Sequence, residues 1–483
     1  MYYSSITNYY IEQLKLYNLS NHKLNFDIDL LIPLIHNLKN TYVNIFTKIN
    51  HQLIKDVYQE NRYNYDYPYI YILLQKLKKN NHDLFISILT NSNINSNHIS
   101  LLIELLEKNN KDKDKIIHDF NNWINSYGLN LVNYLSTIIK KNNHNNINYP
   151  EIYQIFIPVD IQYQIEKYSN HTFIYQSNYQ DTHNNIIVTG TIINNSQSIN
   201  PKFIQLLNHR IIMLCILFNQ QEIHYKFWNI NINKKLDIDK ITTLGPKQVN
   251  TASTYRGYPT IDLWRQEEIK KVMIHEIGHC FKLEFEPDKN NRDYLNLIQF
   301  IYHVFNIPLN TEIRLYEAYN ETWATILNCI FCNIEYNISN DNDVKTYLYY
   351  EICFSCYQTA KIIHYFKFKS FQDFCNRKGF NTKQRDKSLY SQSSSILSYY
   401  IIRSSLLFNL NDFLIYCQRY NTYMNNQYIK FNIEHFKEFQ LLIENSLFNI
   451  HYINYINYLI KKIDTIKKNN TQFYQTMRMT IIE

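Results

Sequence analysis

The spacing of apolar residues divides the chain into parts of different character. In the first 150 residues, apolar positions recur every three or four residues around 30–49, 69–78 and 99–106, as they do on amphipathic helices. Polar, Asn-rich runs at 79–82, 91–98 and 142–148 separate these stretches and are typical of loops. The pattern predicts a helical N-terminal accessory domain over residues 1–150, in which we find no chemical motif.

After residue 150 the pattern favours strands. Residues 185–193 (NIIVTGTII) and 223–232 (IHYKFWNINI) are rich in β-branched and aromatic residues, which favour a pleated sheet. Residues 203–218 between them have the length and spacing of a buried helix. We therefore expect a mixed α/β part over 151–262 and a helical part over 263–483. The predicted fold class is α+β, predominantly helical, with a small mixed sheet.

Residues 263–285 (LWRQEEIKKVMIHEIGHCFKLEF) contain the run HEIGH and no proline. They predict a helix that places HEIGH about three turns from its start. Positions i and i+4 share one helix face, so His275 and His279 can direct imidazole nitrogens at one zinc ion. Glu276 then lies beside the metal, where it can serve as general base and acid. Gly278 is costly inside a helix and predicts close packing next to His279.

A catalytic zinc site needs a third protein ligand and an open position. A metzincin would carry Gly at position 282 and His at 285, but Lys282 and Phe285 stand there, which excludes that class. The Gly-Thr-x-x-Asp pattern of aspzincins is absent downstream.

Residues 315–328 (LYEAYNETWATILN) form an apolar-periodic helix containing Asn-Glu-x-x-Ala. Together with HEIGH, this pattern resembles the gluzincin metallopeptidases, such as thermolysin-like and M1 aminopeptidase-like enzymes, in which a Glu after Asn is the third zinc ligand. The resemblance implies a zincin-like catalytic region with Glu321 as that ligand. Glu317, one turn earlier, is the alternative ligand, with a supporting bond to an imidazole as its other use.

The resemblance also suggests groups that contact substrate. Residues 249–255 (VNTASTY) are extended in propensity and stand where gluzincins place a sheet edge that pairs with the substrate backbone, so Asn250 and Ala252 are candidates for substrate binding. Tyr390 stands before a small-residue run, like the tyrosine of M1 enzymes that donates to the oxyanion. Three further residues compete with it for that role: Tyr399, Tyr400 and His364.

Several features depart from the family pattern. Forty-one residues separate His279 from Glu321, so we expect an additional helix at 294–305. The M1 signature Gly-x-Met-Glu-Asn is absent, which favours an endopeptidase over an aminopeptidase. The resemblance spans roughly residues 245–400. The chain resembles metalloprotease-like proteins of giant DNA viruses. A catalytically inactive structural or interaction protein with a zincin fold, for example a virion component, is the alternative function.

Two other groups of residues have alternative interpretations. The pairs Cys329-x-x-Cys332 and Cys353-x-x-Cys356 match the spacing of a four-cysteine zinc site. Both pairs lie in apolar, helix-like stretches, and we interpret them as buried core cysteines. A peptide deformylase, which adds a Cys ligand to HExxH, would need Gly-rich and Cys-containing motifs that the chain lacks. The charged residues at the start of the HEIGH helix are interpreted as capping or surface charges: Arg265, Glu267 and Glu268.

Composition adds limits on partners and location. The chain has 44 Tyr and 27 Phe but only 6 Gly, a bias typical of AT-rich coding. The net charge of +7 is not gathered in one block, so we expect no specific nucleic-acid partner. The N-terminus resembles neither a signal nor a transit peptide, and no run is long enough to span a membrane. We expect an intracellular protein, cytoplasmic or packaged in a virion, with reduced cysteines and a protein or peptide substrate. Oligomeric state cannot be read from the sequence.

Overall fold

The computed structural model describes residues 4–20, 24, 26–58, 157, 161, 164–165, 171–194, 200–336, 342–421 and 428–483. Residues 1–57 and 171–483 form one compact unit, and residues 58–170 form a second. The elements below belong to the first unit, except the last residue of β1. The predicted helices at 69–78 and 99–106, and the predicted domain boundary near residue 150, lie outside the described residues.

A six-stranded mixed sheet has the strand order β1-β2-β3-β4-β6-β5. β3 pairs antiparallel with β2 and parallel with β4, β4 pairs parallel with β6, and β6 pairs antiparallel with β5. The predicted strand at 223–232 ends earlier, at Trp228. The strands are β1 (Asn50–Tyr58), β2 (His171–Gln180), β3 (Asn185–Asn194), β4 (Glu222–Trp228), β5 (Ala252–Thr254) and β6 (Thr260–Leu263).

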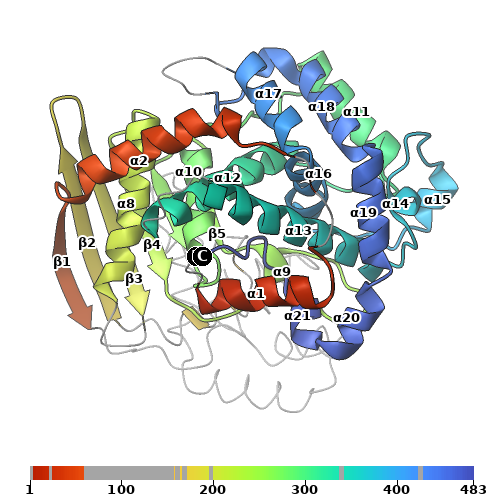
Figure 1. The fold of residues 1–483 in the computed structure, drawn as a ribbon, viewed down its shortest axis with the longest axis horizontal. Helices are drawn as coiled ribbons and strands as arrows, with labels where there is room; N and C mark the ends of the chain where they lie inside the picture. Colours follow the sequence, from red (N-terminus) through yellow and green to blue (C-terminus); the bar gives the residue numbers. More distant parts are fainter. Residues whose placement is uncertain are drawn as a thin grey trace, which may run out of the picture. The chain divides into compact units, whose positions relative to one another are not determined.

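The sheet carries helix α8 (Pro201–Leu217) on one face, as Figure 1 shows. Asn200 caps the helix, because its side chain accepts the backbone N–H of Lys202, and Pro201 occupies the first turn, where its missing N–H costs nothing. α8 contacts β2 and β3, and α2 (Ile32–Phe46) packs against α8. The predicted helices at 30–49 and 203–218 are therefore present. The first is shorter than predicted, and the second begins two residues earlier and ends one residue earlier.

Helices dominate the rest of the unit, which confirms the predicted α+β, mostly helical class. The additional helix expected at 294–305 is α11. The remaining helical elements are α1 (Ser5–Leu16), η1 (Asp29–Leu31), α9 (Pro246–Val249), α10 (Ile269–Cys280), α11 (Arg292–Val304), α12 (Leu315–Glu335), α13 (Asn342–Tyr365), α14 (Phe371–Phe374), α15 (Thr382–Asp386), the π-helix η3 (Leu397–Ile402), α16 (Arg403–Phe408), α17 (Leu410–Tyr420), η4 (Ile433–His435), α18 (Phe436–Leu447), α19 (Ile450–Ile460), α20 (Ile463–Asn469) and α21 (Thr471–Gln475).

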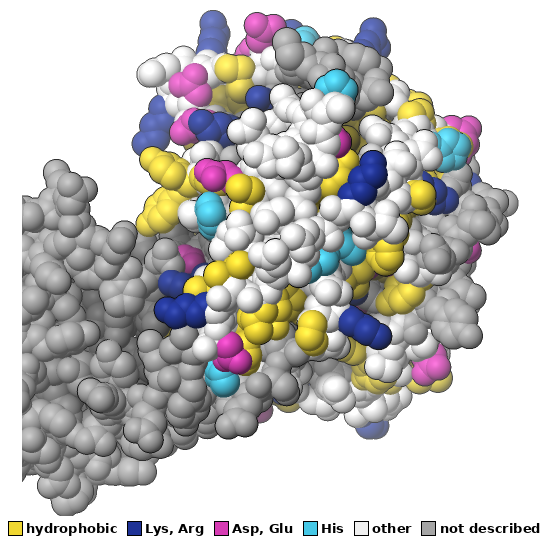
Figure 2. Space-filling view, turned by 90° about the vertical axis from the view of Figure 1, so that its left-hand side faces the viewer, with side chains coloured by type: hydrophobic (Ala, Val, Ile, Leu, Met, Phe, Trp, Pro, Cys, Tyr) yellow, Lys and Arg dark blue, Asp and Glu magenta, His cyan; other side chains and the backbone are white. Residues whose placement is uncertain are grey.

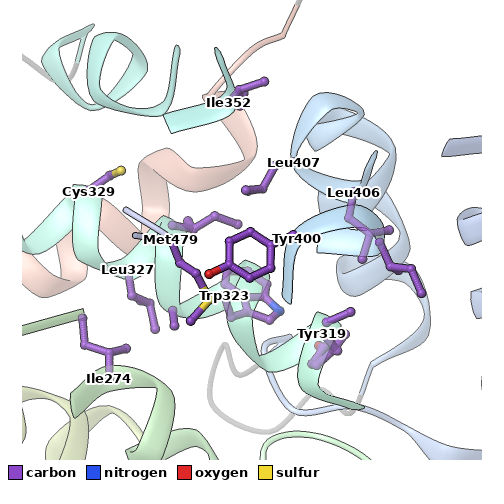
Figure 3. Close-up of a cluster of buried hydrophobic side chains, with 14 of the residues drawn as sticks. Ile274, Tyr319, Trp323, Leu327, Cys329, Ile352, Tyr400, Leu406, Leu407 and Met479 are labelled. Atoms are coloured by element: carbon purple, nitrogen blue, oxygen red, sulfur yellow. The ribbon is translucent and has the colours of Figure 1, made fainter. Parts of the chain in front are cut away.

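The hydrophobic core lies where α12 contacts α10, α13 and α16. Its side chains are almost fully excluded from water, and burial of each large one stabilises the fold by about 1.5–3 kcal/mol. This packing fixes how α10 and α12 face each other. Figure 3 labels part of this cluster: Ile274, Tyr319, Trp323, Leu327, Cys329, Ile352, Tyr400, Leu406, Leu407 and Met479.

Residues 476–483 run through this core as a buried segment that belongs to no helix or strand. Because such a segment forms no regular ladder of backbone hydrogen bonds, buried charged side chains pair with its backbone groups. Glu268 accepts the N–H of Met479 at 2.6 Å and Glu351 accepts the N–H of Ile481 at 2.8 Å. The Arg403 guanidinium donates to the Met479 carbonyl at 2.8 Å. The segment is thereby tied to the start of α10 and to α13 and α16.

The surface shows no block of one charge on the face drawn in Figure 2, where basic and acidic side chains alternate with hydrophobic ones. None of the helices in the described residues is long and apolar enough to cross a bilayer.

Candidate metal centre

Helix α10 is shorter than the sequence pattern indicates, because Leu263 ends strand β6 and the helix begins only at Ile269. HEIGH therefore stands about two turns from the start, not three. Glu268 precedes the helix with a left-handed φ of 61°. The interpretation of the charged residues before the helix as surface or capping charges is wrong: Arg265 and Glu268 are buried, and Glu268 pairs with Lys234.

The two histidines of HEIGH face the same point, as their i, i+4 spacing on α10 predicts. Their Nε2 atoms lie 3.0 Å apart, and both rings are buried. The helix ends at Cys280 and the chain turns through Lys282, whose φ is 54°. This geometry satisfies the requirement that two imidazoles converge on one ion.

The third member of the cluster is Glu317, in the first turn of α12. Its Oε2 lies 3.2 Å from Nε2 of His275 and 3.3 Å from Nε2 of His279. Among the described residues, these three form the group of His, Cys, Asp or Glu side chains whose ligand atoms all lie within 4.8 Å of one another. A buried His-His-Glu set of this kind can hold a metal ion.

Glu321 does not fit its predicted place as the third ligand. Its Oε2 lies 2.7 Å from Nδ1 of His275, on the ring edge opposite the cluster, and its Oε1 pairs with the ammonium of Lys271. The Arg403 guanidinium lies 3.8 Å from the same Oε1. The structure thus exchanges the two predicted roles: Glu317 completes the cluster, and Glu321 supports an imidazole from behind.

A second supporting carboxylate was not expected from the sequence. Glu284 Oε1 lies 3.1 Å from Nδ1 of His279. Arg256, in the turn between β5 and β6, holds Glu284 by donating to its Oε1 at 3.0 Å and to its carbonyl at 2.9 Å. The only sequence signal for Glu284 was an acidic residue shortly after HEIGH, which by itself is too common to interpret.

These contacts indicate where the imidazole protons lie. A neutral imidazole has one N–H, and a carboxylate facing Nδ1 draws the proton to that nitrogen. Glu284 has hydrogen-bond geometry at Nδ1 of His279, and Glu321 lies at ion-pair distance from Nδ1 of His275. Tautomers with the proton on Nδ1 direct both Nε2 lone pairs at each other and at Glu317. Such a donor set is unfavourable when empty and suits a cation with a preference for nitrogen and oxygen ligands.

The electrostatics of the cluster favour a positive charge among its three side chains. Burial lowers the pKa of His275 to about 4. Burial also opposes the charged form of His279, but the carboxylates of Glu317 and Glu284 outweigh it and raise the pKa of His279. The pKa of Glu317 is lowered, because the two imidazoles outweigh its own burial. Glu317 is therefore ionised at neutral pH, as a metal ligand must be.

Glu276, the predicted general base, is buried on α10. Burial raises the pKa of its carboxyl group to about 8, with further contributions from Glu317 and from Asp262 on β6. A carboxyl group whose pKa lies near the operating pH can both accept and release a proton.

Gly278 has the steric role that the sequence predicted. A Cβ atom at this position would lie 1.9 Å from Oδ1 of Asn320. Asn320 uses the space to donate from Nδ2 to the His275 carbonyl at 2.8 Å. The Asn of Asn-Glu-x-x-Ala thus fixes α12 against α10 at the level of the metal cluster.

Tyr390 does not stand at the cluster. It is buried, its ring packs against Phe366 and Phe374, and its hydroxyl donates to Gln392 at 2.6 Å. Tyr399 is the tyrosine of the predicted set that approaches the site, with its ring centroid 6.0 Å from that of His275.

The other two competitors for the oxyanion role are engaged elsewhere. Tyr400 donates to the Met477 carbonyl at 2.6 Å, in the core, and His364 pairs with Asp464 at 3.1 Å. A residue not considered from the sequence, Tyr316, also lies near the cluster, with its ring 6.2 Å from that of His279.

The predicted substrate strand is β5, which occupies one end of the described sheet and contacts α10. Ala252 is its first residue, paired with Leu263 of β6. Asn250 precedes the strand, and its Oδ1 accepts the hydroxyl of Ser394 at 2.8 Å. Ala252 thus lies on a sheet edge, whereas the Asn250 side chain contacts the segment before η3.

The cysteine pairs are core residues, as we interpreted them. All eight cysteines are free and buried. Cys332 receives a bond from Arg210 at 3.3 Å, and Cys356 receives one from Ser404 at 3.6 Å. Within the described residues, no metal-binding group of three contains a cysteine.

Comparison with known proteins finds a relative in a giant virus. The chain is 28% identical over 221 residues to "Uncharacterized protein R210" of Acanthamoeba polyphaga mimivirus, a match that covers 45% of this chain. The chain spans about half the length of that curated relative. No protein-family model and no solved structure matches the chain. The comparisons thus relate the chain to a giant-virus protein and do not assign an activity.

Proposed function

We propose that this protein is a zinc-dependent peptidase of the gluzincin kind, with a preference for internal peptide bonds. The observation that carries the proposal is the buried cluster of His275, His279 and Glu317 with Glu276 next to the first histidine on the same helix. A two-His, one-Glu donor set leaves a fourth position open in tetrahedral zinc sites that hydrolyse peptides.

His275, His279 and Glu317 would hold the ion, and Glu321 and Glu284 would keep the two imidazoles in the tautomer that binds it. A bound zinc ion would supply Lewis-acid polarisation of the scissile carbonyl and would lower the pKa of a water molecule.

Glu276 would carry the proton through the reaction. As a carboxylate it accepts a proton from the attacking water, and as a carboxylic acid it gives that proton to the leaving amine. Its raised pKa of about 8 favours the second step. The positive charge of a bound zinc ion would favour the ionised form that the first step needs.

Two further groups would act on the substrate. An extended peptide would add to the edge strand β5, with backbone hydrogen bonds at Ala252. Tyr399 is half-buried beside His275, and its hydroxyl would donate to the oxyanion that forms on the scissile carbonyl. Tyr399 replaces Tyr390 in this role.

The test combines metal content with hydrolysis. The purified protein should hold about one zinc per chain and cleave an unfolded protein substrate. Glu276→Gln should retain the zinc and abolish cleavage, because only proton transfer is lost. Zinc retained without cleavage of a broad peptide library by the unaltered protein would refute the peptidase and favour a structural role. Zinc retained by His275→Ala would refute the cluster as the metal site.

A further inference from the structure

A basic pocket lies beside the start of the proposed substrate strand. It has a volume of about 580 Å³ and is bordered by α9, by the preceding residues from Lys235 onward and by Ser393. This size is within the range of pockets that hold a small ligand or a few side chains. The metal cluster does not line it, so the pocket is not explained by the catalytic chemistry.

The side chains that line the pocket carry a net positive charge. Lys235, Lys240 and Lys247 line it with three ammonium groups, and Asp237 is the carboxylate among the lining residues. The Asp237 carboxylate accepts a hydrogen bond from the backbone N–H of Asp239 at 3.1 Å, which partly offsets its negative charge. The three lysines are exposed and reach solvent, where they attract anionic groups.

Two segments connect this pocket to the metal cluster. The first runs from Lys247 through α9 and Asn250 into β5, which contacts α10. The second runs from Ser393 to Tyr399, whose ring faces His275.

These two segments are tied to each other along the way. The N–H of Ser393 donates to the Leu244 carbonyl at 2.8 Å, and the N–H of Leu244 donates to the Ser391 carbonyl at 3.0 Å. Further along, the Ser394 hydroxyl donates to Asn250 at 2.8 Å. The same two segments therefore border the pocket at one end and approach the metal cluster at the other, through β5 and Tyr399.

We propose that this pocket is a substrate subsite that selects peptides with acidic side chains several residues from the scissile bond. The inference rests on the proposed peptidase function. Four residues separate Lys247 from Ala252, and the first two of them belong to the helical turn α9. Because an extended peptide advances about 3.3 Å per residue, an Asp or Glu a few residues beyond the part that pairs with Ala252 would reach the three ammonium groups.

Binding to a chemically inert form tests the subsite separately from catalysis. The zinc-loaded Glu276→Gln protein is titrated into fluorescent twelve-residue peptides that share a neutral centre and carry Asp-rich, Lys-rich or Ser-rich flanks. Anisotropy should give about tenfold tighter binding for the Asp-rich peptide than for the Ser-rich one, the sum of three partly exposed ion pairs. The difference should shrink as salt rises.

Removing the lysine charges tests whether this pocket causes the acidic preference. Replacing Lys235, Lys240 and Lys247 together by Gln should remove the tenfold preference. The matched control replaces three exposed lysines near the C-terminus, Lys437, Lys461 and Lys468, and should keep the tenfold preference. In the active protein the same triple variant should raise KM for an acidic substrate and leave kcat unchanged.

Three results would contradict the proposed subsite. The first is equal binding of the three peptides, and the second is an acidic preference that persists in the triple-lysine variant. The third is a single-stranded DNA of twelve nucleotides that binds through the same lysines more tightly than the Asp-rich peptide does. If the unaltered protein cleaves nothing but the acidic preference depends on the pocket, then the peptidase proposal fails and the binding site stands.

Discussion

The exchange of roles between Glu317 and Glu321 gives the sharpest test of the site. Both lie on α12, one turn apart, and both are buried. Glu317 lies 3.2 and 3.3 Å from the two Nε2 atoms, whereas Glu321 lies 2.7 Å from Nδ1 of His275. Replacing each in turn by Gln preserves shape and removes one charge. The two variants should differ strongly in metal affinity.

The magnitude follows from linkage between binding and folding. At a zinc concentration 100 times Kd, binding stabilises the unaltered protein by about 2.7 kcal/mol. Loss of a supporting carboxylate weakens metal affinity about 10- to 100-fold, so Glu321→Gln should keep roughly 1.4 to 0.4 kcal/mol of that gain at the same zinc concentration. Glu317→Gln loses a ligand and should gain almost nothing.

The assay is urea unfolding of each variant with and without zinc, so that each protein is its own reference. This removes the effect of either substitution on the metal-free fold. Competition with a chromophoric chelator gives Kd independently. The reasoning is refuted if Glu317→Gln keeps most of the zinc-dependent stabilisation while Glu321→Gln loses it, the result that the sequence pattern alone predicts.

Three further predictions concern packing, catalysis and pH. Gly278→Ala should cost about 1–3 kcal/mol of unfolding free energy in urea, because its Cβ would meet Asn320; if the cost is unchanged when Asn320 is also replaced by Ala, the contact is not the cause. Tyr399→Phe should lower kcat about 100-fold while Tyr390→Phe leaves it unchanged, and equal losses would reject the choice between them. Burial lowers the pKa of His209 to about 4, whereas the unfolded chain binds that proton near pH 6.5. The unfolding free energy should therefore fall as pH drops from 6.5 to 4, by about 1–2 kcal/mol after solvent screening. Urea denaturation across this pH range should show that the unfolding free energy of His209→Gln changes less with pH than that of the unaltered protein. Equal pH dependence of the two proteins would contradict the assignment to His209.

Local geometry made part of the site predictable from the chain alone. The i, i+4 spacing of His275 and His279 forces both rings onto one face of any helix that contains them. Gly278 could be interpreted because a glycine inside a helix costs stability that packing must repay. The strands β3 and β4 followed from their β-branched and aromatic residues, and the helices that set the fold class followed from apolar spacing; both signals are local.

The position of α12 along the axis of α10 could not be predicted from local sequence. Glu317 and Glu321 lie on the same side of α12, and the sequence does not say which turn faces the histidines. The bond from Asn320 to the His275 carbonyl, made possible by Gly278, sets that level. It brings Glu317 to Nε2 and leaves Glu321 at Nδ1.

The same reason explains the other differences. Tyr390 precedes η3, whereas Tyr399 lies within it, and the packing of η3 on α12 brings Tyr399 to the cluster. Glu284 reaches His279 because Arg256 holds it from a neighbouring turn. The sequence by itself determined the helix that presents two histidines and a carboxyl group. The tertiary structure decided which distant carboxylate and tyrosine meet them, since side-chain contacts between elements depend on their relative placement and not on local periodicity.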